Sequence, residues 1–153
     1  LKVDPLGIEI YSDEYFMRQA FMEAQRAYEE DEIPIGAVIV SKNKVIGRGH
    51  NLTERLTDVT AHAEMQAITA ASSYLGSKYL KDCTLFVTLE PCPMCAGALF
   101  WSQIGRVVFA APDPKRGFLE HGGYLHPKTK LEQGLLQAEC SELIRAFFAR
   151  KRA

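Results

Sequence analysis

The chain has 153 residues, a length that suits one domain with a sizeable hydrophobic core. Its composition, 47% hydrophobic and 24% charged, is typical of a soluble globular protein, and no apolar run is long enough to span a bilayer, so we expect no membrane partner. The net charge of −1 does not by itself indicate a nucleic-acid partner.

The first residues bear on the cellular compartment. They contain no apolar segment and carry Asp4 and Glu9, so we expect no secretory signal and a cytoplasmic location. The four cysteines of such a chain are expected to be thiols or metal ligands and not a disulfide framework.

The next segment predicts a helix followed by a hairpin. Residues 1–11 are expected to be a flexible N-terminal segment, and Ser12 is a suitable N-cap for a helix that ends in the acidic run 29–32. Two short β-rich runs, 35–40 and 45–49, flank a turn and predict a pair of strands.

A second helix is predicted after the loop 50–59. Thr60 is its expected N-cap, and the helix runs to about Leu75, where Gly76 ends it. Met65 in this helix is expected to lie in the core.

A strand–helix–strand unit follows. Residues 84–89 and 106–111 predict strands, and 93–103 predict a helix with proline in its first turn. Strands joined by such a crossover are expected to be parallel. Met94 and Trp101 of the helix are expected to lie in the core.

The rest of the chain predicts a loop, a weak strand and a last helix. The loop covers 112–130, the strand 129–136 and the helix 138–152. The sum is a single domain, residues 1–153, with a three-layer α/β/α architecture: a mixed central sheet of about five strands with helices on both faces.

Charge is distributed unevenly along the chain. Residues 1–64 hold 12 acids and 7 Lys or Arg, a net charge of −5, whereas residues 65–153 hold 7 acids and 11 Lys or Arg, a net charge of +4. The C-terminal cations are Arg145, Arg150, Lys151 and Arg152. They suit a polyanionic partner or the negative end of a helix dipole, and charge alone favours the helix dipole.

Two short motifs at predicted helix starts indicate a metal site. Cys92 and Cys95 are three residues apart, so both can reach one ion, and His62 supplies a third ligand from the other helix. Two thiolates and one imidazole leave a tetrahedral zinc one ligand short, which is the mark of a catalytic site that binds water. Zinc lowers the pKa of that water from about 15.7 toward 7.

Glu64 is the candidate proton carrier. It is two residues from His62, about 200° around an ideal helix. Both side chains can therefore approach one metal only if the metal lies beyond the N-terminal end of the helix, toward which first-turn side chains lean. Helix starts also favour thiolates and anionic reaction species.

A pair of cysteines with this spacing also occurs in redox sites and in structural zinc sites. A redox pair needs no His-x-Glu partner. A structural zinc needs a fourth protein ligand, for which Cys83, Cys140 and His50 are candidates. We favour the catalytic zinc, and we expect Cys83 and Cys140 to be small buried residues.

His62-Ala63-Glu64 followed by Pro91-Cys92-x-x-Cys95 resembles the known signature of the zinc-dependent cytidine, deoxycytidylate and adenosine deaminases. A closer resemblance, from about Ser12 to Arg152, is to the bacterial tRNA adenosine deaminases, which convert the anticodon wobble adenosine to inosine. It is carried by Pro34 to Val38, Asn51, Thr60 to Glu64, Thr88 to Cys92, Met94 to Ala98, Ile104 to Phe109, Asp113, Lys115 and the end of the chain from Phe147 to Arg152.

The resemblance implies one Zn²⁺ per subunit, with His62, Cys92 and Cys95 as ligands and Glu64 as the general acid/base. Zinc-bound hydroxide would attack C6 of adenine while Glu64 shuttles the proton. Implied contacts to the substrate are Asn51, Ala63, Asp113, Lys115, Phe148, Lys151 and Arg152. The implied partners are a tRNA anticodon stem-loop and a second copy of the chain in a homodimer.

Two other functions remain as alternatives. Pro93 and Trp101 are similar to residues of the guanine deaminases, which would make the protein a small-molecule aminohydrolase acting on guanine or a nucleoside. The second alternative is a non-enzymatic RNA-binding protein with a structural zinc. The aromatic and basic C-terminal helix favours RNA over a free base.

Overall fold

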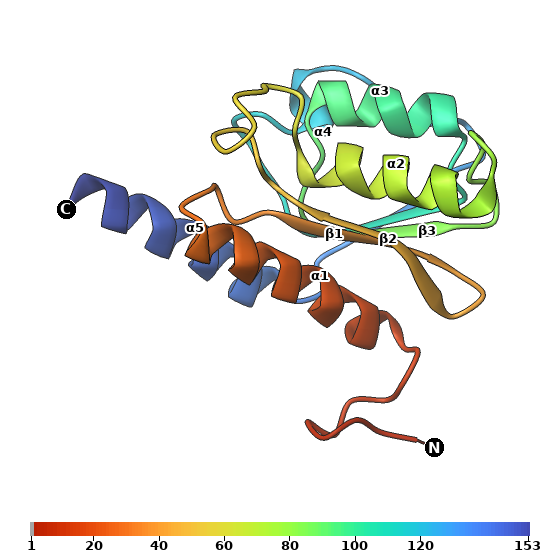
Figure 1. Ribbon diagram of the computed structural model, residues 1–153, viewed down its shortest axis with the longest axis horizontal. Helices are drawn as coiled ribbons and strands as arrows, with labels where there is room; N and C mark the ends of the chain where they lie inside the picture. The colour runs from red at the N-terminus through yellow and green to blue at the C-terminus, as the bar shows by residue number, and fades with distance from the viewer. Residues whose placement is uncertain (1) are drawn as a thin grey trace.

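The computed structural model describes residues 2–153, and in this part of the chain a five-stranded sheet forms the centre of the molecule (Figure 1). Its strands are β1 (Gly36–Ser41), β2 (Lys44–His50), β3 (Thr84–Leu89), β4 (Arg106–Ala111) and β5 (Lys130–Gln133). They lie in the order β2-β1-β3-β4-β5. β1 is antiparallel to β2 and β3, and β4 is parallel to β3 and β5, which confirms the predicted mixed sheet and the predicted parallel pair.

Helices cover both faces of the sheet, as predicted (Figure 1). One face carries α1 (Asp13–Glu29) and α5 (Gln137–Arg152), and the other carries α2 (Ala63–Leu75) and α3 (Pro93–Ser102). A four-residue helix that the sequence did not predict, α4 (Phe118–His121), lies beside α3. No described helix combines the length and the apolar composition needed to cross a bilayer.

Alternation along the strands divides the core in two. In β1, Ala37 and Ile39 pack with the residues of α2 and α3, whereas Val38 and Val40 pack with those of α1 and α5. All four are buried, because both faces of the strand are covered by helices. Gly49 in β2 lets α2 approach closely, since a Cβ there would lie 2.5 Å from the carbonyl oxygen of Ala63.

The start of α2 differs from the prediction. Thr60 is not its N-cap, because the Thr60 hydroxyl donates to the Asp58 carboxylate at 2.7 Å and the helix begins at Ala63. His62 is the N-cap and Glu64 lies in the first turn. Gly76 ends the helix in the left-handed conformation, with φ at 65°, as predicted.

The predicted burial of two α3 residues is wrong. Met94 is 36% exposed and Trp101 is 76% exposed, and Met65 of α2 is only half-buried. α3 contains no charged residue, so its sequence did not reveal which face lies against the sheet. Cys83 and Cys140 are buried, as predicted.

The segment before α1 is short and locally ordered by hydrogen bonds. Val3 and Glu9 form an isolated antiparallel bridge around a turn at Asp4. The flexibility expected for residues 1–11 stays a prediction, and residue 1 lies outside the described part of the chain.

Candidate metal centre and active site

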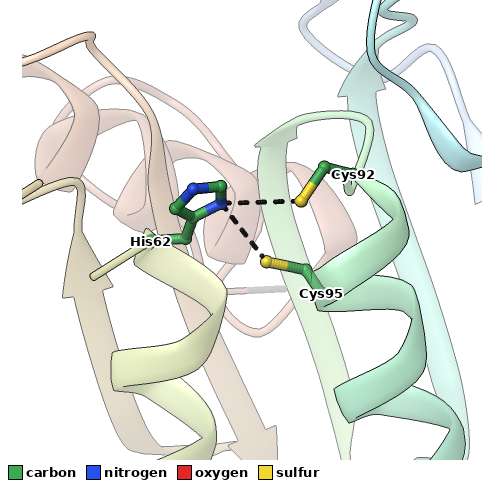
Figure 2. Close-up of side chains that lie close together, drawn as sticks. All are labelled: His62, Cys92 and Cys95. Carbon is green, nitrogen blue, oxygen red and sulfur yellow. Dashed lines mark hydrogen bonds between the residues drawn. The ribbon is translucent and has the colours of Figure 1, made fainter. Parts of the chain in front are cut away.

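Three side chains from two helix starts converge on one point (Figure 2). His62 is the N-cap of α2, Cys92 is the N-cap of α3, and Cys95 lies in the first turn of α3. The Nδ1 atom of His62 is 3.6 Å from the Sγ atom of Cys92 and 3.5 Å from that of Cys95. The ligand atoms of the three residues all lie within 4.8 Å of one another.

These separations fit a zinc ion. A tetrahedral site with bonds of about 2.3 Å to sulfur and about 2.1 Å to nitrogen requires sulfur and nitrogen to be about 3.6 Å apart. The contacts between the Nδ1 atom and the two sulfurs therefore match two edges of such a tetrahedron. One Zn²⁺ is the cofactor that this donor set and the family both indicate.

The predicted alternatives for a fourth ligand lie elsewhere. Among residues 2–153, His62, Cys92 and Cys95 form the one group able to hold a metal in this way. His50 lies between the carboxylates of Glu23 and Glu30, at 3.4 Å and 3.1 Å. The described protein groups thus leave one zinc position for water or substrate, as a catalytic site requires.

Protons are unevenly shared among the three ligands. Hydrogen bonding from Cys95 and from His62 lowers the pKa of Cys92 to about 4, which makes it a thiolate. The hydrogen bond to Cys92 and burial raise the pKa of the Cys95 thiol, and the contact with Cys92 raises the pKa of His62. Zinc takes thiolates and neutral imidazole, so binding the ion would release protons from Cys95 and His62.

Glu64 is buried beside the ligands, in the first turn of α2. Burial is the main cause that raises its pKa to about 7, and this outweighs the stabilising hydrogen bond from its own backbone N–H. A carboxyl group whose pKa lies near neutrality is able both to accept and to donate a proton at physiological pH. This is the property that the proton shuttle predicted from the sequence requires.

A cavity of about 1120 Å³ opens over this site. His62, Glu64 and Cys92 line it. So do six of the seven residues predicted to contact substrate, namely Asn51, Ala63, Asp113, Lys115, Phe148 and Arg152. Segments that are far apart in the sequence therefore meet around one cavity.

Lys151, the seventh predicted contact, lies outside this cavity. Its ammonium group is 2.5 Å from the Asp31 carboxylate, and it lines a separate hollow of about 830 Å³. Arg150 bonds the same carboxylate and lies 4.1 Å from the centre of the Tyr28 ring. These contacts hold the end of α5 against the end of α1, and Phe148 lies between the two hollows.

Part of the cavity wall was not predicted from the sequence. Ser141, Ile144 and Arg145 of α5 line it together with Phe148 and Arg152. Their spacing of three, four or seven residues places them on one helix face, so helical periodicity around Phe148 was the signal that could have identified them.

Two predicted substrate residues differ in how they are held. The side-chain oxygen of Asn51 accepts the N–H of Thr53 at 3.2 Å, which orients the amide at the cavity wall. The Asp113 carboxylate accepts the N–H groups of Lys115 and Arg116, both at 3.2 Å. Asn51 is therefore placed to present its NH₂ group to a ligand, while Asp113 shapes its own loop.

The fold and the open three-ligand site define a zinc-dependent deaminase. The zinc-binding region of the cytidine and deoxycytidylate deaminases matches residues 10–111, which include His62, Cys92, Cys95 and Glu64.

Similarity to individual proteins narrows this class. The tRNA-specific adenosine deaminase of Aquifex aeolicus is 44% identical over 149 residues, which cover 91% of this chain and 95% of the relative. The Bacillus subtilis enzyme of the same name is 44% identical over 143 residues, covering 89% of this chain and 88% of the relative. The chain therefore belongs to the cytidine and deoxycytidylate deaminase family and, within it, to the tRNA-specific adenosine deaminases. In the much longer chloroplastic tRNA(adenine(34)) deaminase of Arabidopsis thaliana, the match covers 12% of the relative at 42% identity.

Solved structures of a tRNA:A34 deaminase and of guanine deaminases superpose on the chain. A structure from studies of A-to-I editing by tRNA:A34 deaminases superposes with a TM-score of 0.79 at 42% identity, covering 84% of this chain and 98% of that chain. The guanine deaminase of Bacillus subtilis superposes less well, with a TM-score of 0.63 at 40% identity over 66% of this chain and 65% of its own. The guanine deaminase of Nitrosomonas europaea, at 23% identity and a TM-score of 0.77, shares the fold.

Proposed function

We propose that the protein deaminates the wobble adenosine of tRNA anticodons to inosine. The observation that carries the proposal is the wall of the cavity above the metal site, which continues along α5 to Phe148 and Arg152. The aromatic ring of Phe148 and the guanidinium of Arg152 suit a splayed RNA base and its phosphate. Recognition of a free base needs neither group. The nearly full-length similarity to tRNA-specific adenosine deaminases supports the same substrate.

The site residues divide the chemistry between them. Zinc held by His62, Cys92 and Cys95 would lower the pKa of a bound water toward neutrality and so supply hydroxide. Glu64 accepts the proton that the water loses and delivers it to N1 of adenine, which makes C6 electrophilic. Glu64 then carries a proton to the departing amine, so that water adds, ammonia leaves and hypoxanthine remains.

Binding draws on the other cavity residues. The Asn51 amide is proposed to donate to the target nucleoside, and the backbone at Ala63 faces the reacting base. Phe148 offers a stacking surface, while Lys115 and Arg152 offer charge to phosphates. An unpaired anticodon base enters such a pocket at lower cost than a base in a duplex. We also infer the cytoplasmic location predicted from the sequence.

We also propose that the protein is a homodimer that pairs through the outer face of α3. Met94 and Trp101 are exposed there, and Leu119 and Tyr124 nearby are 53% and 71% exposed. The Phe100 ring packs edge-on against both Trp101 and Tyr124, so the aromatic residues form a continuous surface. A helix without charges that exposes aromatic rings is typical of an interface, and a second copy would bring a matching surface.

A small-molecule aminohydrolase is the second candidate. The similarity to the Bacillus subtilis guanine deaminase favours it, as do Pro93 and Trp101. Release of ammonia from free guanine at ordinary rates would support this candidate. A non-enzymatic role with a structural zinc is disfavoured, because the described residues provide three ligands and not four.

The test is incubation of the zinc-loaded protein with unmodified tRNA that carries adenosine at the wobble position. We expect inosine at that position and no ammonia from free guanine, cytidine or adenosine. A protein that binds one zinc but forms no inosine would contradict the proposal.

A further inference from the structure

Two buried carboxylates outside the metal site each hold one loop of the cavity wall. Glu32 is 1% exposed and Glu90 is 6% exposed. Neither carboxylate forms an ion pair within residues 2–153; their partners are backbone N–H groups. Burial of a carboxylate is costly unless N–H donors satisfy it, and here the backbone of a cavity loop supplies those donors to each carboxylate.

Glu90 follows β3 and precedes the metal-ligating segment at Cys92. Its two carboxylate oxygens accept the N–H groups of Asp113, at 2.9 Å, and of Leu119, at 3.0 Å. The loop between these residues is wrapped tightly around the carboxylate, since a Cβ on Gly117 would lie 2.2 Å from it. The loop that carries Asp113 and Lys115 is thus fixed to the segment that holds the metal ligand.

Glu32 plays the same part for the loop after β2. Its oxygens accept the N–H groups of Glu54, at 3.0 Å, and of Arg55, at 2.7 Å. This loop begins at Asn51, and its residues Thr53 and Glu54 line the cavity.

The two loops border the cavity from two sides. They follow β2 and β4, and in the sheet β1 and β3 separate these strands. The loop after β2 contributes Asn51 and Thr53 to the cavity wall, and the loop after β4 contributes Asp113, Lys115 and Arg116. The width of the cavity between them therefore depends on where each carboxylate holds its loop.

We propose that Glu32 and Glu90 are positioning residues that set the two loop walls of the substrate cavity and thereby the affinity for the nucleotide to be deaminated. The choice of substrate rests on the proposed function; the holding of the loops does not. The walls contact substrate in the ground state and the transition state alike, so loosening them weakens binding without changing the chemical step.

The test compares the variants Glu90→Gln and Glu32→Gln in the full-length, zinc-loaded protein. Glutamine keeps the shape of the side chain, but its NH₂ group is a donor and cannot accept a hydrogen bond from a backbone N–H. Each variant therefore loses one of its two loop contacts. Backbone amide exchange is expected to speed up roughly tenfold, in residues 113–119 for Glu90→Gln and in residues 53–55 for Glu32→Gln. A factor of about ten is the change expected when one hydrogen bond to a charged group is lost. Each variant should also raise KM for tRNA roughly tenfold, with kcat within about twofold and one zinc retained.

Two further variants keep the test decisive. Gly117→Ala keeps the Glu90 carboxylate chemically unchanged but pushes it out of its position, so it should reproduce the faster loop exchange of Glu90→Gln. Glu23→Gln is the matched control, because Glu23 is equally buried but its carboxylate contacts the side chains of Arg48 and His50 and no cavity loop. It should leave both loops and KM unchanged.

The outcomes separate a positioning role from a structural one. Unchanged loop exchange and KM in both glutamine variants would overturn the proposal. So would a fall in kcat at constant KM with faster exchange throughout the protein, since that pattern reports a smaller folded fraction. If the wild type itself does not act on tRNA, the proposed function fails, while the exchange data still decide whether the carboxylates hold the loops.

Discussion

At the scale of single residues, the position of Glu64 gives its carboxyl group a pKa that suits the proposed role as both base and acid. It is buried in the first turn of α2, and burial brings its pKa to about 7. The start of the helix at Ala63, two residues later than its sequence predicted, leaves His62 and Glu64 at the end of the helix and not on opposite sides of it. The geometric condition set by their two-residue spacing is therefore met.

Replacement of this carboxylate should separate proton transfer from metal binding. We expect Glu64→Gln to retain one zinc and the wild-type melting temperature while kcat falls by roughly 10²- to 10⁴-fold, because the amide cannot carry the proton. Metal analysis and single-turnover inosine formation on the same sample measure both. Activity within a few-fold of wild type would mean that another group carries the proton.

The cysteines should fall into two classes. Cys92→Ser is expected to lower the zinc content well below one ion per chain, since it replaces a thiolate ligand with a hydroxyl group. Cys83→Ala is the matched control, because Cys83 lies in the hydrophobic core away from the three-residue cluster, and this variant should leave one zinc bound. Metal analysis of both purified variants provides the measurement, and equal zinc content in the two would show that Cys92 is not a ligand.

At the scale of elements, α5 combines an end that is fixed to α1 and a side that faces the cavity. Arg150 and Lys151 bind Asp31 and so fix the helix to the end of α1. Arg152 lines the cavity instead. The basic end of the chain is therefore not a uniform patch, and single substitutions should have different effects along it.

We expect Arg152→Ala to weaken tRNA binding and to lower the slope of log K against log salt by about 0.7, the value for one lost phosphate contact. Lys78→Ala serves as the control, since Lys78 lies just beyond the C-terminal end of α2 and does not line the cavity. Binding titrations over a range of salt concentrations give both slopes. An unchanged slope for Arg152→Ala would show that its charge does not meet a phosphate.

Elements set by local chemistry were predictable, whereas contacts between distant segments were predictable only where a motif or a crossover marked them, as for His62 with Cys92 and Cys95. Ser12 caps α1 and Gly76 ends α2 as predicted, because a cap depends on its nearest neighbours. The cap assigned to Thr60 was wrong because a competing turn with Asp58 uses its hydroxyl. Glu90 was not recognised as a loop anchor, since its partners lie 23 and 29 residues further along the chain.

At the scale of the whole molecule, the exposed face of α3 bears on assembly. The sequence motifs were enough to predict that His62, Cys92 and Cys95 lie together, but the burial of Trp101 depends on which side of α3 meets the sheet. In the folded chain that residue is exposed beside Phe100 and Tyr124. The proposed dimer would return it to a buried environment.

A charge placed on this face should therefore change the molecular mass in solution. We expect the wild type to sediment as a dimer and Trp101→Glu as a monomer, because a carboxylate buried without a partner opposes association. Substitution of an exposed residue away from this face, as in Tyr11→Glu, should leave the dimer intact. Sedimentation equilibrium distinguishes the two, and a monomeric wild type would rule out the proposed pairing.

The most direct test of the central claim is the mapping of inosine in tRNA after reaction with the zinc-loaded protein. Mass analysis of nuclease fragments should find inosine at the wobble position and adenosine retained at the other positions of the anticodon loop, with no inosine formed by Glu64→Gln under the same conditions. The proposed function would be contradicted if the zinc-loaded wild-type protein left the wobble adenosine intact. It would also be contradicted if this protein released ammonia from free guanine instead.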